Sequence, residues 1–193
     1  MLYSSCRTRS GIAIPFVLAW ILGFGLLSLL QPASSARAQS VDQMWVVLRW
    51  LDAEQRGDVD GALAQFADNA VFIGSRATGN CSTHAPCTDL TGIRQQIEGN
   101  IAQHNCYAFR SLQVSGGVVT GIREIPSDAS RANGIDRVVQ SFIAVVSDGK
   151  ITFFAGALDT SDPQTARNAA INAGTQPAGT PLPAPGEACP SLL

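Results

Sequence analysis

The stretch that decides the fold is Trp50-Leu-Asp-Ala-Glu-Gln-Arg-Gly-Asp-Val-Asp-Gly-Ala-Leu-Ala-Gln-Phe-Ala-Asp-Asn-Ala-Val-Phe72. It predicts the end of one helix (residues 41–56), a stop at Gly57, and a short second helix (residues 59–67) capped by Asp58. A short strand over residues 70–73 follows. Upstream, Ser40 and Gln43 form a capping-box pattern for the first helix. Its apolar face is marked at helical spacing by Met44, Val47, Leu48 and Leu51.

Downstream of residue 73, the pattern changes from helical to β. Residues 74–91 are predicted to be a long loop, and residues 92–104 a third helix capped by Thr91. Two hairpins are then expected, with strands 107–115 and 118–125 around Gly116-Gly117, and strands 136–147 and 150–158 around Asp148-Gly149. A last helix is expected near residues 164–172. This order predicts an α+β domain whose helices pack on the concave face of a curved antiparallel sheet.

The stretch from Trp50 to Phe72, together with Gly92-Ile93 and residues 148–159, resembles the NTF2-like superfamily, particularly its SnoaL-like and ketosteroid-isomerase-like branches. The resemblance covers about residues 41–170. It implies a cone-shaped α+β fold with an apolar internal cavity. Members include isomerases, cyclases, dehydratases, epoxide hydrolases and non-enzymatic domains, so the shared fold does not define the function.

The acid and base positions implied by this resemblance carry residues without titrating groups. Counted from the motifs, the isomerase positions fall on Trp50, Gly74 and Phe142, and the principal epoxide-hydrolase aspartate falls on Gly156. An indole can donate a hydrogen bond but cannot act as a general acid. Arg123 is followed directly by Glu124, and neighbours on a regular strand point to opposite faces. A close copy of either mechanism is therefore not expected.

The remaining candidates for a site follow from the strand that carries Phe142. If that residue faces inward, Gln140 is the expected deep polar group and Asp136 the nearest carboxylate. His104 ends the third helix, where a structural role at the helix dipole competes with general-base catalysis. These three are weak catalytic candidates. The expected ligand-binding residues are Trp50, Phe72, Gln140, Phe142 and Phe154.

Four cysteines remain after the first 38 residues, and an even number in an exported chain indicates two disulfides with three possible connectivities. We favour a local disulfide between Cys81 and Cys87 within the predicted loop, and a second disulfide between Cys106 and Cys189 that attaches the C-terminal tail (residues 173–193) to the domain. Cys81, His84 and Cys87 could supply three zinc ligands, but exported cysteines usually oxidise. No metal and no cofactor are therefore expected, and no dinucleotide or P-loop motif is present.

The N-terminus reads as an export signal. Arg7 and Arg9 precede an apolar run over residues 11–30, and Ala36-Arg37-Ala38 forms a cleavage site. An uncleaved membrane anchor is the alternative, since twenty apolar residues can span a bilayer. The predicted organisation is a signal or anchor (residues 1–38), an NTF2-like domain (residues 39–172) and a flexible tail (residues 173–193) that holds five of the ten prolines. Either reading places the folded part outside the cytoplasm.

The charge of the chain limits the classes of partner that it is expected to bind. Without residues 1–38, the chain carries 10 basic and 15 acidic side chains, a balance of −5 that argues against nucleic acid. The leading hypothesis is an exported domain whose apolar cone binds a small hydrophobic molecule or serves as a scaffold for association. The alternative is a cofactor-free acid/base enzyme (isomerase, dehydratase or cyclase, or epoxide-hydrolase-like) with a relocated catalytic group. The resemblance also implies a possible homodimer through the sheet face.

Overall fold

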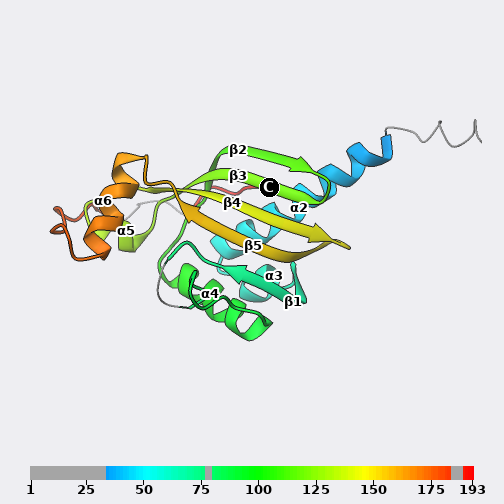
Figure 1. Cartoon of the computed structure of the whole chain (residues 1–193), viewed down its shortest axis with the longest axis horizontal. Helices are drawn as coiled ribbons and strands as arrows, with labels where there is room; N and C mark the ends of the chain where they lie inside the picture. The colour runs from blue at the N-terminus through cyan, green and yellow to red at the C-terminus, as the bar shows by residue number, and fades with distance from the viewer. Residues whose placement is uncertain (1–33, 77–79, 184–188) are drawn as a thin grey trace, which may run out of the picture. The chain divides into compact units, whose positions relative to one another are not determined.

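A computed structural model describes residues 34–76, 80–183 and 189–193. The segment Ala38–Leu193 forms one compact unit. The elements, in chain order, are α2 (Ser34–Gln55), α3 (Val59–Leu63), β1 (Phe66–Ile73), α4 (Leu90–Ala102), β2 (Ala108–Ser115), β3 (Val118–Ile125), α5 (Asp128–Ala132), β4 (Val138–Ser147), β5 (Lys150–Leu158) and α6 (Pro163–Asn172) (Figure 1).

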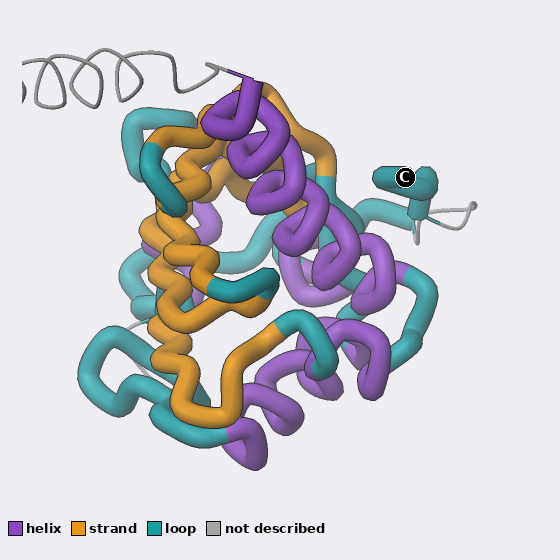
Figure 2. Tube along the Cα trace, turned by 90° about the vertical axis from the view of Figure 1, so that its right-hand side faces the viewer, coloured by secondary structure: helices purple, strands orange, loops and turns teal. Residues whose placement is uncertain are grey.

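The five strands form one open sheet in the order β1-β5-β4-β3-β2. Figure 2 shows them as a curved layer with α2 running along one side. This arrangement confirms the α+β class and the helices packed against a curved sheet. The sheet is mixed rather than wholly antiparallel, because the edge strand β1 runs parallel to β5. The chain leaves β1 through α4 and reaches β5 only after three further strands, so β1 and β5 are not joined as a hairpin.

Both predicted hairpins are present, because the turn residues adopt the backbone conformation that the sequence favours. Asp148 and Gly149 have φ of 51° and 72°, and Gly116 and Gly117 have φ of 54° and 87°. Two successive positive φ values match the twist of paired strands, and glycine and aspartate accept them readily. The strands of both hairpins pair along their lengths.

Several element boundaries differ from the sequence prediction. Helix α3 ends at Leu63 rather than at residue 67, and β1 begins at Phe66 rather than at residue 70, because Phe66 already pairs with Ile151 of β5. Helix α2 begins at Ser34, so Ser40 does not cap it. Helix α4 is capped by Asp89, whose side chain accepts from the Gly92 N–H at 2.8 Å, rather than by Thr91. A short helix, α5, was not predicted. It is capped by Ser127 in a connection of polar residues without an apolar repeat. The Asp58 cap of α3 is confirmed.

The core lies between the inner face of the sheet and α2. Aromatic rings fill its centre, with the Trp50 ring centroid 4.9 Å from that of Phe154 and 5.1 Å from that of Phe66. The Phe72 ring lies 4.7 Å from Phe154. These distances are those of rings in direct contact. The aromatic residues expected to line a cavity therefore pack largely on one another.

Both favoured disulfides are present, as Cys81–Cys87 and Cys106–Cys189. The two cysteines of the first disulfide are six positions apart in the sequence, and those of the second are 83 positions apart. The described part of the tail also contacts the domain, since the Leu182 N–H donates to the Arg131 carbonyl at 2.9 Å. Within the described residues, no helix is long and apolar enough to cross a membrane, and the apolar run over residues 11–30 lies outside them.

Candidate functional site

A buried carboxylate on α2 is the first element of the candidate site. Glu54 is 2% exposed. Its Oε2 accepts from Trp50 Nε1 at 3.0 Å, one helical turn away, and its Oε1 accepts from the Tyr107 hydroxyl. Burial raises the pKa of Glu54, because it penalises the charged form more than these hydrogen bonds and nearby Arg123 favour it. This is a carboxyl group held in a dry environment.

Tyr107, immediately before β2, completes a hydroxyl–carboxylate pair with Glu54. Burial raises the pKa of Tyr107 well above its ordinary value, and the negative charge of Glu54 raises it further. The phenol therefore stays protonated and donates to the carboxylate. Its backbone N–H donates to the side-chain oxygen of Gln55, the residue that follows Glu54. The pair is thus held through both the side chain and the backbone of Tyr107.

Arg123 on β3 is the buried cation beside this pair. Its side chain lies among four aromatic rings, with the guanidinium carbon 4.6 Å from the centroid of Tyr107, 5.4 Å from those of Phe142 and Phe154, and 5.7 Å from that of Trp50. Contacts of this kind stabilise a guanidinium through the negative faces of the rings.

The hydrogen bonds of Arg123 are incomplete. Its Nε donates to Gln140 Oε1 at 2.8 Å, a contact between residues paired across β3 and β4. Its Nη1 is buried and has no hydrogen-bond partner among the described residues. Burial lowers the pKa of Arg123, while Glu54 opposes this shift. An unpaired guanidinium N–H in a dry interior is costly, so this nitrogen is the position at which an acceptor oxygen would be most favoured.

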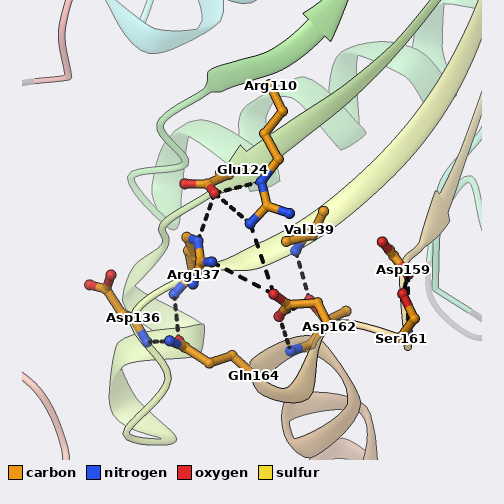
Figure 3. Close-up of polar contacts among 10 residues, drawn as sticks. Arg110, Glu124, Asp136, Arg137, Val139, Asp159, Ser161, Asp162 and Gln164 are labelled. Atoms are coloured by element: carbon orange, nitrogen blue, oxygen red, sulfur yellow. Dashed lines mark hydrogen bonds and ion pairs between the residues drawn. The ribbon is translucent and has the colours of Figure 1, made fainter.

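The neighbouring Glu124 points to the other side of the sheet, as the alternation of a strand requires. It pairs with Arg110 at 2.7 Å and with Arg137 at 2.9 Å, in the polar cluster shown in Figure 3. Asp162 joins this cluster and caps α6 by accepting from the Thr165 N–H at 3.0 Å. Arg110 and Arg137 each pair with both Glu124 and Asp162, which ties α6 to the sheet (Figure 3). We assign this cluster a structural role.

Gln140 is the sequence-derived candidate that the structure brings into this site. It is 5% exposed and bonds Arg123. The position of the expected hydrolase aspartate, Gly156, lies behind it, since a Cβ there would be 2.8 Å from Gln140 Cδ. The amide of Gln140 thus fills the space that a side chain at this position would need. Phe142 faces the same interior, opposite Gly156 in the strand register.

Asp136 and His104 lie away from the buried cluster. Asp136 is exposed, pairs with Arg131 at 3.2 Å, and lines a surface hollow of about 450 Å³ beside α6. His104 is exposed and its Nδ1 lies 2.6 Å from Asp128 Oδ2. Gly74 directly follows β1, and its N–H donates to the Cys81 carbonyl. Across residues 34–76, 80–183 and 189–193, no three His, Cys, Asp or Glu side chains gather as metal ligands.

The sequence interpretation did not include Glu54, Tyr107 or Arg123 among its candidate site residues. Val47, Leu51 and Glu54 are spaced i, i+4, i+7, so Glu54 falls on the apolar stripe of its helix. A carboxylate on such a stripe is the signal that could have identified it. Tyr107 offers no comparable signal, because it lies outside the alternating pattern of β2 and next to a cysteine.

Comparisons with known proteins bear on the fold of the chain. No family model matches the chain, and no curated protein matches it. Among solved structures, an LEH-like epoxide hydrolase from M. tuberculosis matches at 17% identity and a TM-score of 0.51, over 70% of this chain and 98% of that one. A putative ketosteroid isomerase from Kribbella flavida matches at 11% identity and a TM-score of 0.50, over 62% and 79%. An NTF2-like protein of unknown function from Cytophaga hutchinsonii matches at 17% identity and 0.48, over 62% and 91%.

The chain has an NTF2-like fold, an α+β arrangement of helices on a curved sheet that it shares with the epoxide hydrolase and the putative ketosteroid isomerase. The resemblance identified from residues 50–72 is thus confirmed at the level of the fold. Identities of 11–17% carry no activity from these structures to this chain.

Proposed function

We propose that this protein is an exported domain whose cone binds a small, mostly apolar molecule carrying an acceptor oxygen. The observation that carries the proposal is the buried, unpartnered Nη1 of Arg123, set among aromatic rings. A ligand at this nitrogen would lie against aromatic rings and one directed polar donor, and such a combination is typical of small-molecule sites. Glu54 already places one carboxyl group near Arg123, so a neutral oxygen, such as a carbonyl, fits this site better than a second carboxylate.

The test is ligand-dependent stabilisation of the oxidised protein against panels of lipids, sterols and terpenoids. A ligand at one hundred times its Kd raises the free energy of unfolding by about 2.7 kcal/mol. We expect members that bear a carbonyl or ether oxygen to raise Tm, and matched hydrocarbons to raise it less. If no member of any panel shifts Tm, the binding proposal is wrong.

Arginine variants inside and outside the cone separate this site from unspecific binding. Arg123→Met removes the buried donor, whereas Arg110→Met removes an arginine from the outer polar cluster. The ligand shift should be lost in the first variant and kept in the second, each measured against its own baseline without ligand. Equal shifts in both variants would place the ligand elsewhere.

A second candidate function is acid/base catalysis by the same cluster. The specific observation in its favour is a buried carboxyl group of raised pKa that bonds a phenol beside a guanidinium. Glu54 would exchange a proton with the substrate, while Arg123 would stabilise negative charge developing on the substrate oxygen. Glu54→Gln should then abolish turnover of a ketone or epoxide substrate while ligand-dependent stabilisation persists. Unchanged turnover in that variant would exclude this role.

Export and association are the remaining parts of the proposal. Two disulfides support an oxidising compartment, and a mature N-terminus at Gln39, found by mass spectrometry, would establish cleavage rather than anchoring. The outer sheet face presents Ile122 and Ile143, which are 37% and 38% exposed. If this face supports a homodimer, light scattering of residues 39–193 will give twice the monomer mass, and charged substitutions at these two positions will halve it.

A further inference from the structure

The last five residues of the chain, residues 189–193, lie against helix α2. The side chain of Asp52, which is fully buried, holds them by accepting from the Ser191 hydroxyl at 3.0 Å and from the Leu192 N–H at 2.9 Å. The Leu192 side chain packs against the hydrophobic core. A terminal segment without secondary structure is therefore fixed by a buried carboxylate and an apolar contact. We call residues 189–193 the C-terminal strap.

Gln55 joins the strap to the candidate site. Its Nε2 donates to the Pro190 carbonyl at 2.8 Å, and its Oε1 accepts from the Tyr107 backbone N–H. The hydroxyl of Tyr107 in turn donates to Glu54, the neighbour of Gln55 on the same helix. One glutamine side chain thus contacts both the strap and the backbone that carries the site phenol.

The disulfide Cys106–Cys189 makes a second connection between the same two segments. Cys106 directly precedes Tyr107, and Cys189 begins the strap. Both cysteines of this disulfide are partly exposed, whereas Cys81 and Cys87 are 1% and 8% exposed. A thiol in solution therefore reaches Cys106–Cys189 more easily than the other disulfide.

We propose that the C-terminal strap is a redox-releasable clamp, which holds Tyr107 against Glu54 while Cys106–Cys189 is intact and frees it when that disulfide is reduced. In the release step, a dithiol attacks the disulfide. Its two thiols become one disulfide, and Cys106 and Cys189 each end as a thiol, with one electron and one proton gained per sulfur. An effect of this release on ligand binding rests on the cone site proposed above, but the release itself can be measured without any ligand.

The phenol of Tyr107 supplies a direct spectroscopic readout. The chain has two tyrosines, Tyr3 and Tyr107, so the Tyr3→Phe chain reports phenolate absorbance from Tyr107 alone. The groups facing this phenol are Glu54 from α2 and Arg123 from β3. In the oxidised chain it should ionise well above its ordinary pKa, because it is buried. Release of the C-terminal strap should admit water to the Tyr107 hydroxyl and lower the pH at which half of this phenol is ionised by about one pH unit or more.

Selective reduction is the first arm of the experiment. The full-length Tyr3→Phe protein is titrated with dithiothreitol, and alkylated cysteines are identified by mass spectrometry. We expect Cys106 and Cys189 to be alkylated first, together with a fall in the Tyr107 midpoint, while Cys81 and Cys87 remain oxidised. Earlier alkylation of Cys81 and Cys87, or an unchanged midpoint with Cys106 and Cys189 alkylated and the circular dichroism native, would overturn the proposal.

The second arm keeps both disulfides and removes the glutamine link. Gln55→Ala should lower the Tyr107 midpoint in the oxidised protein, whereas Gln65→Ala should not, because the Gln65 side chain bonds only the Gly61 carbonyl among the described residues. This arm decides the question if reduction unfolds the chain. A folded Gln55→Ala variant with the midpoint of its parent refutes the clamp. Neither arm uses a ligand, so a failed binding panel and a failed clamp are distinct results.

Discussion

The burial of Glu54 predicts that this residue makes stability depend on pH in a direction opposite to that of a surface carboxylate. Its folded pKa lies above the ordinary value of 4.5, chiefly because of burial. The folded chain therefore holds the Glu54 proton more tightly than the unfolded chain does. The stability contributed by this group is complete below the ordinary pKa and is lost as pH rises through the raised one.

The perturbation is Glu54→Gln, which removes the charge and keeps the shape. The amide oxygen can accept from Trp50 and its NH₂ can donate to the Tyr107 oxygen, so both contacts retain a hydrogen bond. Below the pKa of Glu54 neither protein carries a charge at this position, and above it only the wild type carries a negative charge beside Arg123. Only the pH-dependent part of the difference reports the titration of Glu54.

The magnitude follows from linkage. Between the ordinary and the raised pKa, the free energy of unfolding of the wild type relative to Glu54→Gln should fall by up to about 1.4 kcal/mol per pH unit, and then level off. Urea denaturation at a series of pH values measures both curves. Glu98→Gln supplies the control, because it removes an exposed carboxylate from α4. Parallel wild-type and Glu54→Gln curves would refute the assignment of Glu54 as a buried, titrating carboxyl.

Three further perturbations test neighbouring parts of the molecule. Arg123→Met should lower the free energy of unfolding by about 3–5 kcal/mol, because Glu54 is left without its buried counter-charge, and the loss should shrink when Glu54 is also replaced by Gln. Replacing Cys106 and Cys189 by Ser opens a loop spanning 83 residues and should cost about 4–5 kcal/mol in denaturant unfolding. Asp162→Ala should cost about 1–2 kcal/mol at neutral pH, since it removes the cap of α6. Because the Thr165 N–H holds the pKa of Asp162 below its ordinary value of 3.8, the difference from wild type should vanish as pH falls through that lowered pKa.

Local sequence chemistry predicted the framework of the fold well. The Asp148-Gly149 and Gly116-Gly117 turns require positive φ, and few other residues accept it, so the two turns could be placed to the residue, whereas β2 and β4 begin one and two residues later than predicted. The Asp58 cap is equally local. Helix α5 could not be found in this way, because five residues capped by Ser127 carry no periodicity and depend on packing against the rest of the chain.

The candidate site was harder to predict, because its members meet only through strand register and helix packing. Alternation correctly separates Arg123 from Glu124, but it does not say which of them faces the core. The contact between Arg123 and Gln140 depends on the pairing of β3 with β4, which no residue spacing reveals. Gln140 was nevertheless identified, because Phe142 two residues away fixed the inward face of its strand.

One physical explanation connects the absence of titrating groups at the implied catalytic positions with the presence of buried polar groups elsewhere in the interior. Gly156 leaves room that Gln140 occupies, and Gln140 orients Arg123 through its Nε. A guanidinium so deep in the core needs a nearby negative charge, which Glu54 provides from α2 rather than from the sheet. The buried ionisable groups of Glu54 and Arg123 therefore lie on α2 and β3 rather than at the positions that the resemblance implies. The Arg123 Nη1 still lacks an acceptor among the described residues, so the hydrogen bonds of this cluster are incomplete, and the proposed function assigns an uncharged acceptor oxygen of a ligand to this position.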